Sequence, residues 1–248
     1  MTDPAQTLSQ SKTKRKLYQH GTLALLVPGL LRGTLTMKQL LNHGDTGIGT
    51  GEGLDGELII LNGQPYQVNA QGKVTIVTDD FTMPFANIHR ADYHDLMDLE
   101  HLSMQEAYQA ITQSVKAENT FYSIQIHGLF STMTTRAVRK SKPPYHTLVE
   151  TADEQRIFQS QNIAGTLLGY YSPAVFHGST VSGFHSHFLA DNHSMGGHIL
   201  DFSVAKVHVT IQIFDTFEQH LPIDDQEYMQ HDFSKDNIAS AITHAEGQ

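Results

Sequence analysis

Four histidines lie within the twenty residues "GFHSHFLADNHSMGGHILDF", positions 183–202. His185 and His187 are separated by one residue, and in a β-strand such a pair points to the same face, roughly 6.6 Å apart along the backbone. The residues "HILDF" resemble the returning strand of a hairpin, which would bring His198 beside this pair. Because the chain has no cysteine, a metal must be held by histidine and carboxylate side chains. Three neutral imidazoles with open positions are typical of a catalytic zinc site.

Other interpretations of this cluster stay open on the residues alone. The chain has sixteen histidines, so close pairs on an ordinary exposed strand are expected by chance. A cupin also uses a His-x-His strand, but it normally adds a carboxylate shortly downstream, and here only Asp191 could serve. His193 falls in the connecting loop, and we expect it to be exposed rather than a ligand.

The net charge and the apolar segments limit the partners and the location that the sequence allows. The chain has 248 residues and a net charge of −10, whereas nucleic acids and anionic membranes require clustered positive charge. A basic run at positions 12–16 lies in a polar segment, so we expect residues 1–18 to form a flexible tail. This segment has no signal-peptide apolar core, and "LALLVPGLL" is too short to span a membrane. The sequence therefore predicts a cytoplasmic protein with a small-molecule partner.

Hydrophobic periodicity and turn signals predict an α+β fold with mixed or antiparallel sheets and a few flanking helices. Asn62-Gly63 marks the turn of a hairpin at 56–68, and 73–79 reads as a third strand of that meander. A capping box from Ser103 to Glu106 opens a helix. The other predicted helices are 36–45 and 234–247, and the other predicted strands are 120–128, 135–140, 156–173 and 205–214. In the last strand we expect Val207, Val209, Ile211 and Ile213 on the buried face and Lys206, His208, Thr210 and Gln212 on the other.

Several motifs together make the sequence recognisable. The stretches "GTLTMKQLLNHGDTGIGTGEGLDGELIILNGQPY", "HGLFSTMTTRAVRKSKPPY" and "GTLLGYYSP", followed by the histidine cluster, closely resemble the bacterial α-acetolactate decarboxylase family. The resemblance runs from about Gln19 to the C-terminal helix. It implies one family domain over 19–248, built as a single unit or as two closely packed α+β subdomains, and a homodimer. At 51–53 this chain has Gly-Glu-Gly where the family often has larger residues, which alters the rim of the pocket.

The resemblance also implies the site residues. It implies a zinc ion on three histidines that align with His185, His187 and His198. The further active-site residues of the family match Glu57 in "LDGEL", Arg136 on the strand before "PPY", Thr50 in "GIGT" and Glu246 near the C-terminus.

The chemistry of this reaction suits these residue types. Loss of CO2 from 2-hydroxy-2-methyl-3-oxobutanoate leaves negative charge that spreads into the neighbouring carbonyl, and zinc chelated by the keto and hydroxyl oxygens stabilises the enediolate as a Lewis acid. Arg136 can position the carboxylate or oxyanion, and Glu57 is the candidate acid that protonates the enediolate. The product, acetoin, leads in this family to butanediol.

Two rival functions follow from the same residues. One is a cupin-like metal oxygenase, and the other is a non-catalytic protein that binds a metal or small ligand. A glutamate beside a turn and an arginine on a strand are often merely solvated. The "LDGELI" motif together with Arg136 argues against simple metal storage, which needs neither an acid nor a carboxylate clamp.

Overall fold

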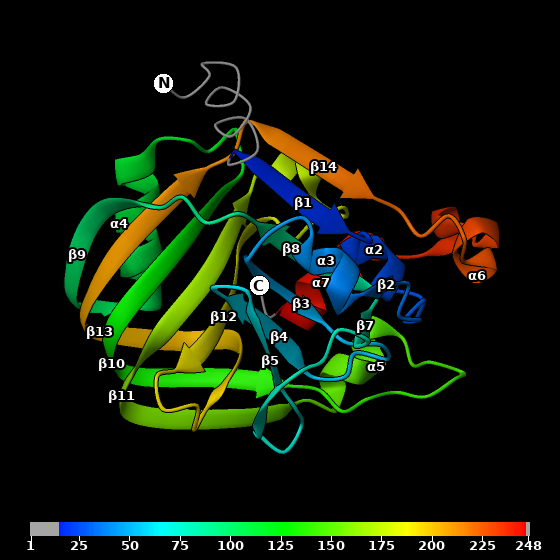
Figure 1. Ribbon diagram of the computed structural model, residues 1–248, viewed down its shortest axis with the longest axis horizontal. Helices are drawn as coiled ribbons and strands as arrows, with labels where there is room; N and C mark the ends of the chain where they lie inside the picture. The colour runs from blue at the N-terminus through cyan, green and yellow to red at the C-terminus, as the bar shows by residue number, and fades with distance from the viewer. Residues whose placement is uncertain (1–14, 247–248) are drawn as a thin grey trace, which may run out of the picture.

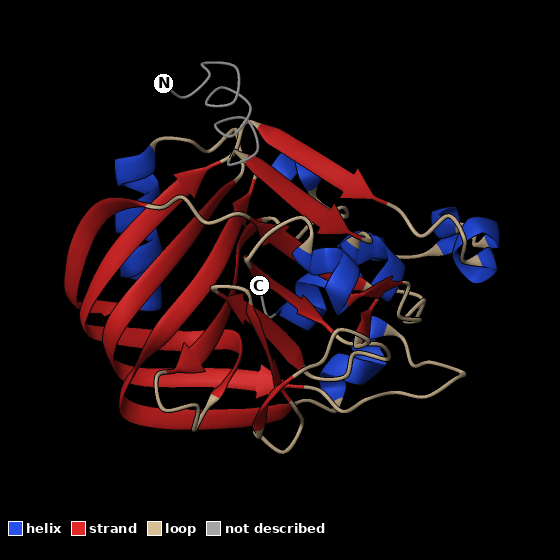
Figure 2. Ribbon diagram, viewed as in Figure 1, coloured by secondary structure: helices blue, strands red, loops and turns tan. Residues whose placement is uncertain are grey.

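The computed structural model describes residues 15–246 and confirms an α+β fold. Two large sheets face each other, and short helices gather at one end of the molecule (Figures 1 and 2). The first sheet has seven strands in the order β14-β1-β8-β3-β4-β5-β6. Their bounds are β1 Lys16–His20, β3 Thr46–Thr50, β4 Glu57–Leu61, β5 Gln64–Val68, β6 Val74–Ile76, β8 Phe85–His89 and β14 Thr216–His220. All neighbours in it are antiparallel except β1 and β14.

The second sheet has five strands in the order β10-β11-β12-β13-β9, and β10 also pairs with β13. Its strands are β9 His94–Ser103, β10 Tyr122–Ala137, β11 Arg156–Ser172, β12 Gly183–Ala190 and β13 Gly196–Ile213. Each of β10, β11, β12 and β13 is therefore hydrogen-bonded to two others, and the four strands form a closed ring of antiparallel pairings. Register shifts near Phe130 and Thr134 interrupt the pairing of β10 with β13, and such bulges bend a strand. Figure 1 shows the long strands curving around the interior.

Short elements complete the fold. A small sheet pairs β2 Leu35–Thr36 with β7 Thr82–Met83. The helices are α2 Leu23–Leu26, α3 Met37–Leu41, α4 Met104–Val115, α5 Leu148–Asp153, α6 Gln226–Gln230 and α7 Ile238–Glu246, with 3-10 turns at Ala174–Phe176 and Phe233–Lys235. Among residues 15–246, none of the helices has both the length and the apolar character that a membrane span needs.

The alternation of side chains along β12 explains how the two sheets fit together. Phe184 and Phe188 point into an apolar cluster that includes Ala107 and Ile111 of α4. Leu189 points the other way and packs against Ile59 of the first sheet. Because side chains alternate along a strand, the odd-numbered residues of β12 face the first sheet, and the histidines at 185 and 187 are among them.

Most of the expected elements are confirmed, with altered ends. The Asn62-Gly63 hairpin, its third strand and the capping box of Ser103 and Glu106 are present. The helix expected over 36–45 ends at Leu41, and the last helix begins at Ile238. The strands expected at 120–128 and 135–140 overlap one continuous strand, β10, which begins at Tyr122 and ends at Ala137. Strand β1 includes residues 16–18, which we assigned to the flexible tail, and positions 1–14 of that tail lie outside the described residues.

The expected alternation over 205–214 holds as far as Ile211 and then fails. Ile213 is exposed, whereas Gln212 is buried. The reason is polar: the Gln212 side chain donates to the Arg90 carbonyl at 2.9 Å and accepts from the Asp92 amide at 2.6 Å. Two backbone groups thus satisfy the buried amide, which makes its burial tolerable.

The packing of α4 on the second sheet leads to a stability prediction. Ile111 is fully buried in this contact, so Ile111→Ala should lower the free energy of unfolding by about 2–5 kcal/mol through lost burial and a cavity. Urea denaturation measures this change. Ile76→Ala, at a side chain that is 61% exposed, is the matched control and should change it by less than about 1 kcal/mol. Equal losses in the two variants would contradict the packing.

Candidate active site

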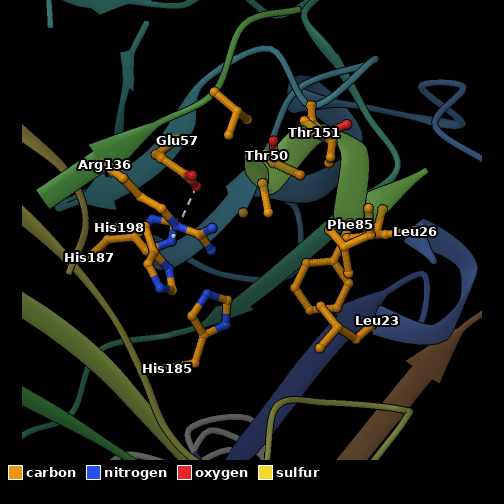
Figure 3. Close-up of a pocket in the computed structure, with 15 residues that line it drawn as sticks. Leu23, Leu26, Thr50, Glu57, Phe85, Arg136, Thr151, His185, His187 and His198 are labelled. Atoms are coloured by element: carbon orange, nitrogen blue, oxygen red, sulfur yellow. Dashed lines mark ion pairs between the residues drawn. The ribbon is translucent and has the colours of Figure 1, made fainter. Parts of the chain in front are cut away.

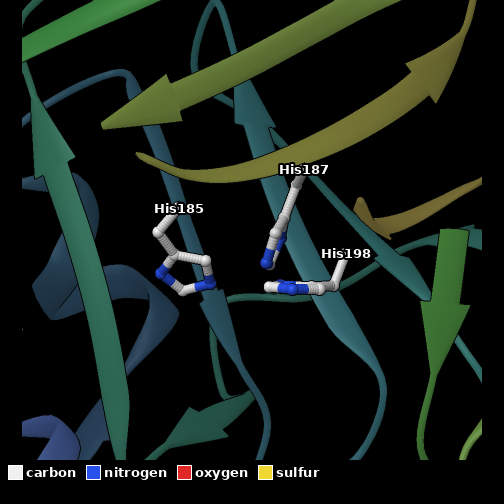
Figure 4. Close-up of side chains that lie close together, drawn as sticks. All are labelled: His185, His187 and His198. Carbon is white, nitrogen blue, oxygen red and sulfur yellow. The ribbon is translucent and has the colours of Figure 1, made fainter. Parts of the chain in front are cut away.

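The three histidines of the sequence cluster converge in the structure (Figure 4). His185 and His187 lie on β12 and His198 lies on β13, where it is the register partner of His187. One ring nitrogen from each residue lies within 4.8 Å of the others, and all three side chains are buried in the interior. Among residues 15–246 this is the one group of three or more potential ligands that is close enough to share a metal ion. The residues expected to form the metal site are therefore brought together by the fold.

A backbone carbonyl fixes which nitrogen of His187 faces the site. His187 Nδ1 lies 2.8 Å from the carbonyl oxygen of Leu58 on β4, and a carbonyl can only accept, so Nδ1 carries the proton. The lone pair of the neutral ring is then on Nε2, which is buried and has no hydrogen-bond partner within residues 15–246. Metal-binding histidines commonly have their second nitrogen held in this way. The orphaned Nε2 therefore fits a metal ligand.

Burial keeps all three imidazoles neutral. It lowers the pKa of His185 to about 3, with a smaller contribution from the positive charge of Arg136. Burial is also the largest cause that holds the pKa of His187 and of His198 well below the usual value, and Arg136 and the neighbouring histidines act in the same direction. Because only a neutral imidazole can donate its lone pair to a metal, these rings are in the metal-binding form at neutral pH.

Glu57 and Arg136 flank the histidines (Figure 3). Arg136, near the end of β10, is the register partner of His198, so Arg136, His198 and His187 form one row across three strands. Glu57, at the start of β4, places Oε2 3.5 Å from His187 Nε2. This contact would be an ion pair only if His187 were protonated, and burial opposes that. The carboxylate thus lies beside the nitrogen of His187 that faces the pocket.

Thr50 lies at the end of β3 beside this group, and its hydroxyl donates to the Gly56 carbonyl at 2.8 Å. The hydrogen bond ties the end of β3 to the residue before Glu57. Thr50, Glu57, Arg136 and the three histidines all line one pocket. Glu246 is the last residue of α7, and its side chain lies outside the described residues. Asp191 and His193 are exposed and do not belong to the histidine group, as expected for His193.

The opposite wall of the pocket is apolar, and we did not identify it from the sequence. Its side chains come from α2, from the loops after β3 and β10, from β8 and from α5; they are Leu23, Leu26, Leu54, Phe85, Val138, Leu148 and Ala152. The run "LALLVPGLL" was a signal for part of this wall, but the same run is typical of any buried segment. The pocket thus has a polar end with potential metal ligands and a hydrophobic end.

The chain is similar throughout to proteins of one family. The family model described as alpha-acetolactate decarboxylase matches residues 17–235. The alpha-acetolactate decarboxylase of Lactococcus lactis subsp. cremoris is 35% identical over 233 residues, which are 93% of this chain and 98% of the relative. That of Bacillus licheniformis is 33% identical and covers 95% of this chain and 93% of its own.

Solved structures agree with these relatives. The alpha-acetolactate decarboxylase of Bacillus subtilis strain 168 has a TM-score of 0.89 and 30% identity, over 94% of this chain and all of its own. A Staphylococcus aureus protein of unknown function, described as similar to alpha-acetolactate decarboxylase, has a TM-score of 0.89 and 38% identity, over 93% of this chain and all of its own.

The convergence of the three imidazoles predicts a metal site with shared ligands. His185→Ala, His187→Ala and His198→Ala should each weaken metal binding by about 100-fold or more, because one of three protein ligands is lost. Elemental analysis after dialysis measures bound metal, and circular dichroism checks the fold. His193→Ala, in the exposed loop, is the control and should keep full metal content. Full occupancy in all three site variants would contradict the shared site.

The lowered histidine pKa values predict the pH dependence of stability. Between about pH 6.5 and pH 3 the unfolded chain protonates His185 and the folded metal-free protein does not, and the lowered pKa values of His187 and His198 act in the same direction. Stability should therefore be fully present above pH 6.5 and fall as the pH drops, by up to about 1.4 kcal/mol per pH unit for each buried histidine. Urea unfolding of chelator-treated protein measures this slope. His185→Gln should make the slope shallower, and an identical slope in this variant would refute the cause.

Proposed function

The chain belongs to the alpha-acetolactate decarboxylase family, and on that premise we propose that it decarboxylates 2-acetolactate to acetoin in the pocket lined by the three histidines, with zinc as the metal. The observation that carries the proposal is the meeting of three neutral imidazoles, a carboxyl and a guanidinium at one end of a pocket whose other end is apolar. A 2-hydroxy-3-keto acid has matching parts: three oxygen-bearing groups on one side and methyl groups on the other.

His185, His187 and His198 would hold the metal, and their donor set suits zinc, although three imidazoles also accept other divalent metals. When bound, the metal supplies a Lewis acid that draws electron density from the substrate's oxygens. The observation that these residues suit a metal ion is that Nδ1 of His187 carries the proton and its buried Nε2 has no hydrogen-bond partner within residues 15–246.

Arg136 is the group that binds the substrate's carboxylate. Its guanidinium is buried and lines the pocket, and a guanidinium can hold a carboxylate through two parallel hydrogen bonds. When the carbon–carbon bond breaks, its electron pair moves into the adjacent carbonyl and gives an enediolate while CO2 leaves. The apolar wall excludes water from this step, which strengthens the electrostatic interactions in the pocket.

Glu57 is the acid that returns a proton to carbon. In its protonated form the carboxyl lies beside His187 and can deliver its proton to the enediolate, which then becomes acetoin. Thr50 holds the end of β3 next to Glu57 through its bond to the Gly56 carbonyl. We assign Glu246 to the same proton-transfer or substrate-orienting network on family resemblance alone.

The rival functions have less support. A cupin-like oxygenase would need a carboxylate ligand, and the nearest downstream candidate, Asp191, is exposed and contacts His127 at 3.4 Å instead. A pure binding protein would not need Glu57 and Arg136 at the ligand cluster. The expected homodimer and cytoplasmic location stay predictions.

Two substitutions test the assigned roles in an assay for acetoin and CO2 from acetolactate. Glu57→Gln keeps the shape but has no proton to give, and Arg136→Lys keeps the charge but loses the planar fork. Each should retain its metal and lower kcat by about 100-fold or more, within the range for a lost acid or oriented donor. Gln159→Glu, at an exposed position of β11, is a control that should leave kcat unchanged. Normal turnover in either site variant would remove that residue from the mechanism, and no acetoin from the unaltered protein would refute the function.

A further inference from the structure

The loop of residues 51–56 joins two proposed site residues. It begins after Thr50 at the end of β3 and ends before Glu57 at the start of β4, and its Leu54 lines the pocket. The position of this loop therefore sets the positions of Thr50 and Glu57.

Glu52 fastens this loop to two other segments. Its Oε1 accepts a hydrogen bond of 3.0 Å from the Tyr145 hydroxyl, and its Oε2 accepts one of 3.1 Å from the Thr82 hydroxyl. Burial, followed by the hydrogen bond to Glu52, raises the pKa of Tyr145 to about 12. The phenol therefore keeps its proton at neutral pH and can act as the donor.

Tyr145 belongs to a different segment of the chain that lines the pocket. It lies in the loop that connects β10, which carries Arg136, to α5, whose Leu148 and Ala152 line the apolar wall. A backbone hydrogen bond of 2.8 Å from the Ser141 amide to the Gly53 carbonyl runs beside the side-chain contact. The Gly53 amide in turn donates to the Leu31 carbonyl at 2.8 Å, just beyond α2.

Two glycines make this close approach feasible. Gly53 has φ +69°, which favours glycine, and a Cβ there would collide with the Ser141 carbonyl oxygen. A Cβ at Gly33 would collide with the Thr82 side chain and come within 3.0 Å of Glu52 Oε2. Larger residues at these positions would push the segments apart, so the glycines and the glutamate act as one unit.

We propose that Glu52 is a positioning residue of this enzyme: by binding Tyr145 and Thr82, it holds the Thr50–Glu57 side of the pocket at a fixed distance from the Arg136–α5 side. The inference rests on the proposed function, because the spacing matters when Glu57 must protonate a substrate that Arg136 holds. Glu52 itself does not line the pocket. A shift of about 1 Å between such groups is enough to reduce turnover strongly.

Glu52→Gln, Tyr145→Phe and the double variant test the proposal. Glutamine is neutral and has a single acceptor oxygen, so one hydroxyl must turn to accept from its NH2 group and both contacts lose their charge-assisted strength. Phenylalanine removes the Tyr145 donor alone. Each single variant should lower kcat on acetolactate about tenfold, which corresponds to about 1.4 kcal/mol. The double variant should also lose about tenfold rather than about 100-fold, because both changes break the same contact. Bound metal should stay unchanged.

Matched controls exclude a general loss of stability. Glu106→Gln removes a carboxylate that accepts from Ser103 in the capping box of α4, and Tyr93→Phe removes a hydroxyl that contacts Ser123 at 2.7 Å. These controls should lower the melting temperature to a similar extent and leave kcat unchanged. A loss of kcat in the controls equal to that in the Glu52 and Tyr145 variants would overturn the positioning role.

Hydrogen exchange supplies a readout that does not depend on turnover. The Glu52 amide, which donates to the Thr82 carbonyl at 3.0 Å, and the Ser141 amide, which donates to the Gly53 carbonyl, should exchange faster in Glu52→Gln and in Tyr145→Phe than in the unaltered protein, because their bonds join the segments that the Glu52 side chain connects. If exchange is unchanged in both variants, Glu52 does not hold the two sides together. Faster exchange with full kcat would refute the positioning role. If the unaltered protein forms no acetoin, the proposed function is wrong whatever the role of Glu52. Amide hydrogen exchange then decides by itself whether the contacts of Glu52 hold the two segments together.

Discussion

The pairing register of three strands is the constraint on which the site depends. Arg136, His198 and His187 are successive partners across β10, β13 and β12. A slip of one residue would turn a strand's side chains to the opposite face and would replace His187 with Ser186 or Phe188. The closed ring of pairings among β10, β11, β12 and β13 resists such a slip, because each strand is held on two sides. The ring thus supplies the rigidity that three ligands and a guanidinium need.

The alternation along β12 connects this register to the core. Phe184 and Phe188 are held in the cluster beneath α4, while His185 and His187 face the first sheet. Between the histidines, Ser186 accepts a hydrogen bond of 2.9 Å from the Tyr108 hydroxyl of α4. One face of the strand is therefore anchored by aromatic packing, and the other face presents the two imidazoles to the pocket. The free energy for holding the site comes from the rest of the core, as is common for polar sites in proteins.

The sequence predicts those parts of the site that follow from local periodicity. The His-x-His spacing and the returning strand were enough to predict that three potential metal ligands converge, and the turn at Asn62-Gly63 was enough for the meander that carries Glu57. Contacts between distant segments were not predictable: the Leu58 carbonyl is a backbone atom without a residue signature, and Tyr145 lies 93 positions from Glu52. The apolar wall could not be predicted, because leucines such as Leu23 and Leu148 are found in the core of any protein. Gln212 was misplaced because its burial depends on two backbone groups in another segment.

The hydrogen bond from His187 to the Leu58 carbonyl crosses from one sheet to the other. The same imidazole thus connects the two sheets and is a potential metal ligand. Its orientation depends on the spacing of the sheets. Substitutions in the layer between them, such as around Ile59 and Leu189, should therefore change the orientation of His187 although neither residue lines the pocket. Attempts to raise thermostability by repacking that layer would also shift one of the three potential metal ligands. The safer region for such engineering is the surface beyond α4, on the far side of the second sheet.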